Sequence, residues 1–201
     1  LLDINRKKML SYEESLKILK ETDALVEGHF ILSSGLHSTK YIQCAKLMSK
    51  PKYAAKFCNS LAEKIKDSVS NIDLILSPAM GGIIVGYEIG KILEKETIFS
   101  ERVNNLFTLR RNFQIKKNSK VLIVEDVITT GKSSLECSEL IKKTNSSIVG
   151  FACLIDRSQG KSLIKENIIS QIKIDIPTYE SNNLPEELNK IKAIKPGSRN
   201  L

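Results

Sequence analysis

Two adjacent carboxylates, Glu125 and Asp126, stand between an apolar run and a loop rich in hydroxyl groups. The run Val121–Val124 is typical of a strand in the centre of a sheet, so the two acids are expected where that strand emerges. A buried acidic pair would be unfavourable there. At an exposed ligand-binding edge, one carboxylate can accept hydrogen bonds from two neighbouring sugar hydroxyl groups, which makes the pair a candidate sugar site.

The segment Thr129–Ser134 has the features of a phosphate site. It supplies four hydroxyl groups, a flexible glycine and the N-terminus of a predicted helix, and all three favour a bound phosphate. Gly131-Lys132-Ser133 also matches the end of the triphosphatase loop GxxxxGK[ST], but that motif needs glycine at position 126, where this chain has Asp126. The sequence therefore argues against a triphosphatase. The remaining alternative, solvated acids followed by a helix cap at Ser133, leaves the acids and threonines unexplained.

The basic residues allow two interpretations. The net charge is +8, and the lysines are scattered, as on a solvated surface, whereas Arg102, Arg110 and Arg111 fall in one ten-residue stretch. Clustered guanidinium groups favour a phosphate or carboxylate clamp, because each can donate two parallel hydrogen bonds to such an anion. Only 5% of the residues are aromatic, there is no Trp, and no basic helix is evident, so a nucleic-acid surface is not favoured.

Histidine and cysteine offer little chemistry. A Ser/His/Asp triad or a His-based metal site would depend on His29 and His37, and no GxSxG or HExxH motif supports either one. We expect His37 to be a polar turn residue. The four cysteines form no CxxC pair and are expected to be reduced, partly buried thiols.

The chain has 201 residues, 41% hydrophobic and 27% charged, which predicts one folded globular domain. No apolar run approaches the roughly 18 to 20 residues of a membrane helix, so no membrane association is expected. The first residues lack the pattern of a secretory signal. A cytoplasmic location is the expectation.

The N-terminal part predicts helices and short strands. Ser11 and Glu14 form a capping-box pattern that opens a helix at about 12–27. The apolar segments 30–32 and 41–42 flank a polar turn and predict two short strands. Pro51 can occupy the first position of a helix whose apolar stripe runs to Ile65.

From residue 73 the chain alternates between strands and helices. Strands are predicted at 73–77, 97–100, 120–125, 148–155 and 171–175, and helices at about 82–94, 132–144 and 161–168. This alternation predicts an α/β fold with a mainly parallel sheet, covered on both faces by helices and joined by right-handed crossovers. Such a sheet binds its ligands at the C-terminal ends of its strands.

The segment 121–134 resembles the phosphoribosyl pyrophosphate (PRPP) signature of type I phosphoribosyltransferases. The resemblance implies a doubly wound sheet with a small N-terminal hood, and a magnesium cofactor held mainly by the substrate rather than by the protein. It assigns the ribose 2- and 3-hydroxyls to Glu125 and Asp126. It assigns the remaining contacts with PRPP to Val127, Ile128, Thr129, Thr130, Gly131, Lys132 and Ser133, of which the last five would hold the 5-phosphate.

Other segments are similar, in the same order, to the orotate branch of this family. They are the substrate segment 28–38, the pyrophosphate loop 78–82, the catalytic-loop segments 99–102 and 108–113, and the strand end 154–157. The resemblance implies pyrophosphate contacts from Ala79, Met80, Gly81 and Gly82, catalytic roles for Arg102, Arg110 and Arg111, and orotate contacts from Ser34, Gly35, Thr129 and Arg157. It further implies a homodimer that converts orotate and PRPP to orotidine 5-monophosphate and pyrophosphate, a step of pyrimidine nucleotide synthesis. Within one domain, the hood would span about 1–45, the core 46–176 and a C-terminal tail 177–201.

The chain departs from the family pattern at several positions. Many orotate enzymes have Lys where this chain has Ser33, Gly81 and Arg102, and related loops often have Gly where it has Asn105 and Asn112, which indicates a different subgroup. Simpler roles also remain open: Arg157 could form an ion pair with Asp156 or Glu166, and Arg110 and Arg111 could be solvated.

Two other functions remain open. A phosphoribosyltransferase for a purine or another pyrimidine base would share segment 125–133 and differ at 28–43 and at Arg157. A ligand-sensing nucleic-acid regulator would need an added DNA-reading element, and one helix before Gly28 is too little for a helix-turn-helix. The C-terminal segment 184–201 could pack as a helix and a tail beside the site, or remain mobile.

Overall fold

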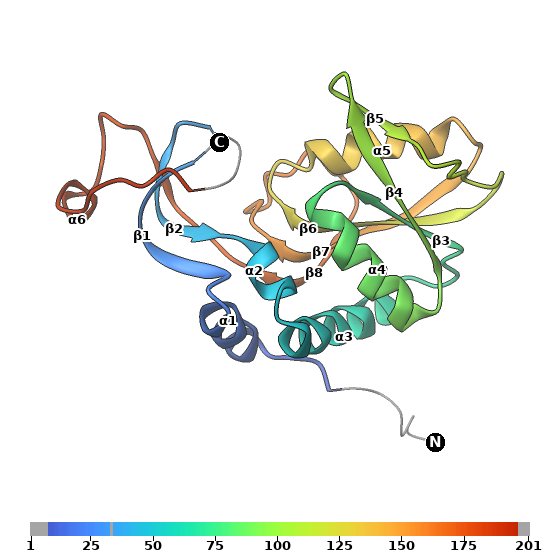
Figure 1. Ribbon diagram of the computed structural model, residues 1–201, viewed down its shortest axis with the longest axis horizontal. Coiled ribbons are helices and arrows are strands. Elements are labelled where there is room, and N and C mark those ends of the chain that lie inside the picture. Colours follow the sequence, from blue (N-terminus) through green and yellow to red (C-terminus); the bar gives the residue numbers. More distant parts are fainter. Residues whose placement is uncertain (1–7, 33, 197–201) are drawn as a thin grey trace.

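The computed structural model describes residues 8–32 and 34–196, and its chain forms two sheets (Figure 1). The six-stranded sheet has the order β5-β4-β3-β6-β7-β8, and the smaller sheet has the order β1-β2-β9. The elements are α1 (Tyr12–Glu21), β1 (Leu25–Ile31), β2 (His37–Ile42), α2 (Cys44–Met48), α3 (Pro51–Ser68), β3 (Leu74–Pro78), α4 (Gly81–Leu93), β4 (Glu96–Val103), β5 (Leu106–Leu109), β6 (Lys120–Ile128), α5 (Lys132–Lys142), β7 (Ser147–Asp156), β8 (Ile168–Lys173), β9 (Thr178–Tyr179) and α6 (Glu186–Asn189).

The larger sheet confirms the predicted doubly wound α/β fold. Strands β4, β3, β6, β7 and β8 run parallel, and β5 is an antiparallel edge strand. From β3 the chain builds outward through β4 and then returns to the other side of β3 to add β6, β7 and β8. The order of strands therefore reverses between β3 and β6, and the crevice at their carboxyl ends is the usual ligand position in such a sheet.

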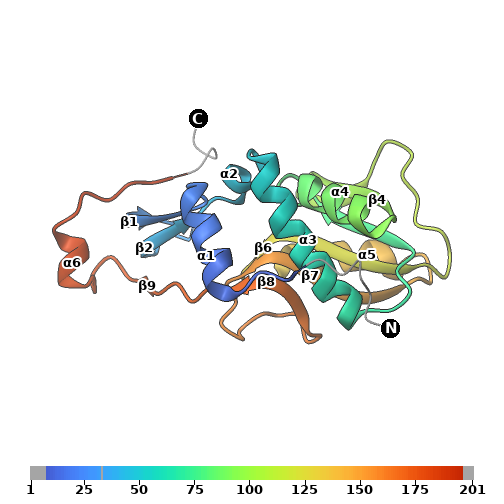
Figure 2. The same ribbon diagram turned by 90° about the horizontal axis from the view of Figure 1, so that it is seen from below.

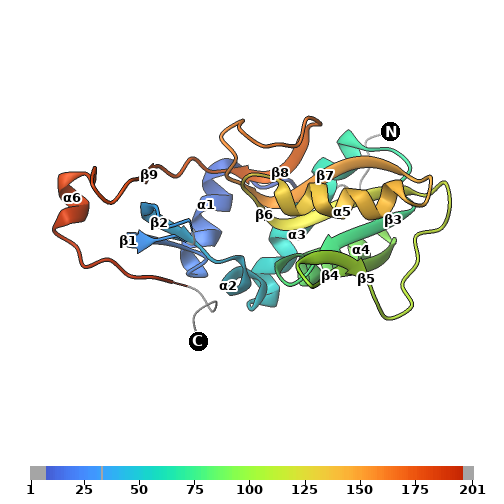
Figure 3. The same ribbon diagram turned by 90° about the horizontal axis from the view of Figure 1, so that it is seen from above.

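Helices cover both faces of this sheet (Figures 2 and 3). Helices α3 and α4 pack on one face, where Phe57, Leu61 and Ile89 join the larger apolar core. Helix α5 packs on the other face, where Cys137 and Ile141 join a second core. Because both faces are covered, the central strands are apolar at nearly every position, as Val121–Val124 shows.

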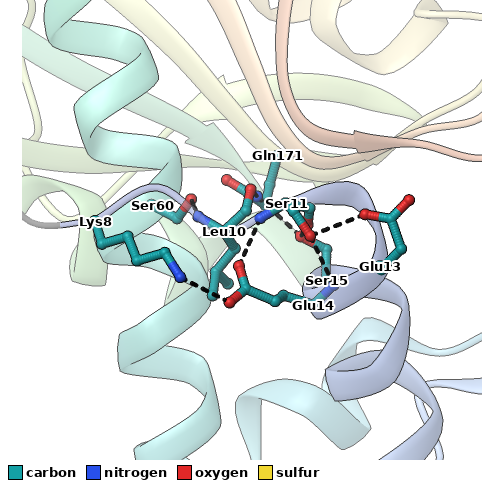
Figure 4. A network of polar contacts seen from close by, with 8 residues as sticks. All are labelled: Lys8, Leu10, Ser11, Glu13, Glu14, Ser15, Ser60 and Gln171. Atoms are coloured by element: carbon teal, nitrogen blue, oxygen red, sulfur yellow. Dashed lines mark hydrogen bonds and ion pairs between the residues drawn. The ribbon is translucent and has the colours of Figure 1, made fainter.

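Helix α1 begins at the predicted capping box (Figure 4). The Ser11 hydroxyl accepts a hydrogen bond from the Glu14 amide, and the Glu14 carboxylate accepts one from the Ser11 amide at 2.8 Å. The same network joins α1 to the core, because Leu10 N donates to the Ser60 hydroxyl and Gln171 Nε2 donates to that of Ser15. These contacts fix the base of the hood against α3 and β8.

The N-terminal hood is built around the β1–β2 hairpin. Strand β9 adds to β2, and Ile194 pairs with Phe30 on the other side of the hairpin, so the C-terminal segment contributes to both edges. The hood projects from the end of the larger sheet (Figure 1).

One predicted helix is shorter than expected and another does not form. The first helix ends at Glu21 rather than near 27, because Asp23 adopts a left-handed conformation (φ 56°) and Leu25 begins a strand. No helix forms at 161–168: Gly160 is left-handed (φ 73°), and Leu163 N donates to Thr130 O at 2.8 Å instead of within a helix. This segment is a loop that leads into β8. Strand β8 begins at Ile168, three residues before the start of the predicted strand 171–175, and ends at Lys173, two residues before the end of that strand.

The arginine-containing segment is more ordered than the loop that was predicted. Strands β4 and β5 form a hairpin whose turn residues, Asn104 and Asn105, are both left-handed (φ 51° and 65°). Asparagine tolerates this conformation, which two-residue hairpin turns require. The short elements α2 and β9 were likewise not predicted, whereas α6 forms in the C-terminal segment for which a helix was one of the open alternatives. In the part of the chain that the model describes, no helix has both the length and the apolar character needed to cross a membrane.

Candidate active site

The predicted site segments meet at the carboxyl ends of β3, β6 and β7. Glu125 and Asp126 lie within β6, which continues to Ile128, so the strand is three residues longer than predicted. Gly131, in a left-handed conformation (φ 77°), then precedes α5. The hydroxyl of Thr130 accepts a hydrogen bond from Lys132 N at 3.3 Å. The hydroxyl-rich loop therefore leads directly into a helix N-terminus, as the phosphate prediction requires.

The two acids are less exposed than the sequence suggested. Glu125 is only 8% exposed, and its carboxylate accepts a hydrogen bond from the hydroxyl of Ser134 on α5. Burial raises the pKa of Glu125 to about 7, while the Ser134 hydrogen bond opposes that shift. Burial also raises the pKa of Asp126, whose Oδ1 accepts from Val127 N at 2.9 Å. The expectation of an exposed pair is wrong for Glu125, whereas Asp126 is half-buried, and a merely solvated role does not fit Glu125.

The predicted pyrophosphate loop lies against these acids. Ala79, Met80, Gly81 and Gly82 join β3 to α4, with a cis peptide bond between Ala79 and Met80, and Ala79 N donates to Ser100 O at 2.8 Å. A Cβ atom added at Gly81 would lie 2.6 Å from Cγ of Asp126. The absence of a side chain at position 81 therefore lets the two segments make contact.

A cavity of about 780 Å³ lies between the hood and this end of the sheet. It is lined by Ile31, Leu32, Ser34, Leu36, Tyr41, Gln43, Thr129, Thr130, Arg157, Ser158, Gln159, Lys161, Ile176, Thr178, Lys195 and Pro196. Three of these residues are cations, and no carboxylate is among them within residues 8–32 and 34–196. The cavity suits an anion that also has a flat or apolar part.

Three of the four predicted orotate residues line this cavity. Arg157, Thr129 and Ser34 do so, whereas Gly35 lies beside it in the β1–β2 turn, in a left-handed conformation (φ 86°). Ser33, noted in the sequence as a departure from the family pattern, lies outside the described residues.

Arg157 follows the last residue of β7. Its Nε is buried without a hydrogen-bond partner in the described chain, and burial lowers the pKa of its guanidinium. The alternative of an ion pair is wrong: neither Asp156 nor Glu166 pairs with it, and Asp156 Oδ1 instead accepts from Ser158 N at 2.8 Å. A buried cationic donor without a partner, beside a cavity, is a candidate ligand contact.

The three arginines predicted to be catalytic are placed differently. Arg102 on β4 stacks on Phe107, with 4.1 Å between Cζ and the ring centroid, and pairs with Glu136 of α5. It lies near enough to Glu125 to lower the pKa of that carboxyl. Arg110 and Arg111 both pair with Glu101, at 3.5 and 2.8 Å. Only Arg102 is therefore brought toward the acids, and the other two are bound at the base of the hairpin.

The histidines form a structural pair. Nε2 of His29 lies 2.6 Å from Nδ1 of His37, and the other nitrogen of His29 lies 2.8 Å from Ile191 O. His37 begins β2 and is thus not a turn residue. Among the described residues, no group of three His, Cys, Asp or Glu could hold a metal ion, and all four thiols are buried and unpaired by disulfides.

The sequence interpretation missed several cavity residues. Tyr41 and Gln43 lie two positions apart at the end of β2, and this alternation could have indicated a shared face. Lys161 begins the segment mistaken for a helix, and Gln159 lies two residues before it. Lys195 had no such signal, because its position depends on the pairing of Ile194 with β1.

Comparisons with known proteins agree with this geometry. The family model of the phosphoribosyl transferase domain matches residues 50–189. The chain is 46% identical over 193 residues to orotate phosphoribosyltransferase of Parvibaculum lavamentivorans, covering 96% of this chain and 100% of the relative.

Solved structures show the same fold. The orotate phosphoribosyltransferase of Aeropyrum pernix superposes with a TM-score of 0.69 at 22% identity, covering 79% of this chain and 92% of the other. The adenine phosphoribosyltransferase of Thermoanaerobacter pseudethanolicus gives 0.59 at 18% identity, covering 67% and 88%. The fold is therefore shared by enzymes that act on different bases, so fold similarity alone does not identify the base. The relative with 46% identity is an orotate phosphoribosyltransferase. With an acid pair and a hydroxyl-rich loop on this fold, and a relative aligned over 96% of this chain, the chain belongs to the phosphoribosyltransferase family, in its orotate phosphoribosyltransferase branch.

Proposed function

We propose that this protein transfers ribose 5-phosphate from PRPP to N1 of orotate, giving orotidine 5-monophosphate and pyrophosphate. The main support is Nε of Arg157, which is buried without a hydrogen-bond partner beside the cavity. The described residues that line this cavity include three cations and no carboxylate. Orotate is a planar anion, so its carboxylate and carbonyl oxygens would complete the hydrogen bonding of Arg157. Thr129 and Ser34 offer further hydroxyl donors in the same cavity.

The donor would lie along β6 and the start of α5. The carboxylates of Glu125 and Asp126 would accept hydrogen bonds from the ribose hydroxyls, and Thr129–Ser133 would surround the 5-phosphate. Val127 and Ile128 would contribute through the backbone, since the side chain of Ile128 is buried in the core. Gly81 and Gly82, at the start of α4, bring the backbone of this loop against β6, so its amide groups would bind the pyrophosphate next to Asp126.

The reaction breaks the bond between C1 of the ribose and the pyrophosphate oxygen and forms a bond from C1 to N1 of orotate with inversion. The proton on N1 is lost to the departing pyrophosphate or to water. Positive charge develops on the ribose ring as pyrophosphate leaves, so catalysis depends on positioning and on neutralising the leaving group. Arg102 is the best placed cation of the hairpin for this role. Arg110 and Arg111 would contribute only after separating from Glu101.

The acids present fit a magnesium ion that is held mainly by the substrate. Glu125 and Asp126 are adjacent, but the described residues supply no third carboxylate, His or Cys for a protein-bound ion. Mg²⁺ bound to the pyrophosphate would supply charge neutralisation and bring the donor into register with these two acids.

The proposed assembly is a homodimer. Met80, Ile84 and Tyr87 are spaced along one face of α4 and are 81%, 56% and 64% exposed. An apolar stripe of this kind, beginning in the pyrophosphate loop, suits a second copy of the same chain. The proposed place of action is the cytoplasm, where four unpaired thiols stay reduced.

The test is the ultraviolet absorbance of orotate with purified protein, PRPP and Mg²⁺. We expect absorbance loss that requires the donor and is abolished by chelation of the metal. Parallel reactions replace orotate with uracil, hypoxanthine or adenine. Turnover of one of these bases in place of orotate would refute the orotate assignment and retain the phosphoribosyl transfer.

A further inference from the structure

The C-terminal segment 190–196, here called the C-terminal strap, is hydrogen-bonded to the edge of the hood. Ile194 pairs in parallel with Phe30 of β1. Ile194 N donates to His29 O, and Ile31 N donates to Ile194 O, both at 2.8 Å. The strap therefore runs back from α6 along β1 (Figure 1).

A buried histidine fixes the strap at a second point. His29 is 4% exposed, and its Nδ1 lies 2.8 Å from Ile191 O, which requires that this nitrogen carry the proton. Its Nε2 lies 2.6 Å from Nδ1 of His37, so one proton is shared between the two rings. The strap is thus held at Ile191 and at Ile194, and the next residue along, Lys195, lines the cavity between hood and sheet.

The charges around that cavity show what Lys195 can recognise. Arg157 and Lys161 come from the sheet side, and Lys195 comes from the hood side. Lys195 lines the cavity together with Ile31, Leu32 and Ser34 of the hood, whereas the phosphate loop has its own donors at the N-terminus of α5. Thr129 and Thr130 line the same cavity, so the position of Lys195 within the hood is what favours the base. The preceding residue, Ile194, exchanges hydrogen bonds with His29 and Ile31, and this side of the cavity carries Ser34, a predicted orotate contact.

We infer that Lys195 is a specificity-determining residue whose ammonium group, with Arg157, binds the carboxylate of orotate. This inference rests on the proposed function and extends it, because it makes the C-terminal strap a wall of the active site. An ammonium group supplies a charge for a carboxylate without the fixed two-donor geometry of Arg157, so the two cations can act on one anion.

The experiment compares Lys195→Met with Lys192→Met. Methionine keeps most of the aliphatic length and removes the charge, and Lys192 is an exposed lysine of the same strap that does not line the cavity. For Lys195→Met we expect the KM and the calorimetric Kd for orotate to rise by about fivefold, which equals about 1 kcal/mol. The KM for PRPP and the melting temperature should change little, and Lys195→Arg should restore orotate affinity.

Each other outcome has a distinct meaning. The inference would be overturned if Lys195→Met and Lys192→Met had the same KM and Kd for orotate. A rise in the KM for PRPP alone would place Lys195 on the donor phosphate and would also overturn it. If the wild-type protein fails to use orotate, the proposed function itself fails, so the two failures are distinguishable.

Discussion

Arg157 combines burial, charge and an unpartnered donor in one side chain. Replacing it with alanine should raise the KM for orotate at least about tenfold, because a hydrogen bond to a charged group contributes about 1.5 to 3 kcal/mol. The KM for PRPP should change little. Lys161→Ala is the control, since Lys161 lines the same cavity but is exposed. Steady-state kinetics with each substrate varied separately would check this, and equal effects of Arg157→Ala on both KM values would remove Arg157 from the orotate site.

The Glu125 carboxyl is proposed to bind the ribose hydroxyls, and its burial disfavours the charged form. Its pKa in the folded protein is about 7, above the ordinary value of 4.5. The folded state therefore holds the proton more tightly than the unfolded state. Its contribution to stability is fully present below about pH 4.5 and is lost as the pH rises through about 7.

Glu125→Gln should accordingly stabilise the fold at pH 8 and change little near pH 4.5. The expected gain is at most about 3 kcal/mol, because one pKa unit corresponds to about 1.36 kcal/mol. The same change should raise the KM for PRPP, since the amide is a weaker acceptor for ribose hydroxyls. Denaturant titrations at both pH values measure the gain. Glu139→Gln, on the exposed side of α5, is the control; a gain at pH 8 that Glu139→Gln matches would contradict the explanation.

At the scale of elements, the site depends on contacts between segments that are distant in sequence. The loop between β3 and α4 touches β6 because position 81 carries no side chain. The β4–β5 hairpin reaches α5 through Arg102 and Glu136. In this arrangement Arg102 is already held near Glu125, while the pairs with Glu101 hold Arg110 and Arg111 away.

Gly81→Ala tests the first of these contacts. The added Cβ would displace the carboxylate of Asp126, so the KM for PRPP should rise about tenfold or more while the melting temperature changes little. Gly86→Ala provides the contrast, because its Cβ would lie 3.0 Å from Cβ of Ser77 in the packed interface of helix and sheet. It should lower the melting temperature. An unchanged KM for PRPP in Gly81→Ala would show that the contact is not needed for donor binding.

At the scale of the whole molecule, the proposed dimer depends on the exposed face of α4. Ile84→Glu should convert the dimer to a monomer, since a charge at the centre of an apolar interface loses its hydration on association. Light scattering after size-exclusion chromatography measures the mass. Leu163→Glu is a matched control, because both side chains are 56% exposed and Leu163 lies on a different surface loop. A wild-type monomer, or a dimer that survives Ile84→Glu, would exclude this face.

The sequence by itself determined the order of the core strands and helices from β3 to β7, except for the edge strand β5, and it located the acids and the hydroxyl-rich loop. These features are local, since the apolar run, the acids and the phosphate loop are contiguous and helix and strand periods can be read over a few residues. Local signals were insufficient at 161–168, where apolar residues at helical spacing instead form a loop bound to Thr130 O.

Only the tertiary structure decided how the separate segments meet. The burial that raises the pKa of Glu125, the contact of Gly81 with Asp126, and the lining of one cavity by both Lys195 and Arg157 all join residues from different elements. Each depends on packing between parts of the chain that are far apart in sequence, which no local pattern records. The sequence thus determined which chemistry the chain could carry, whereas packing decided which side chains share one cavity and in which charge state.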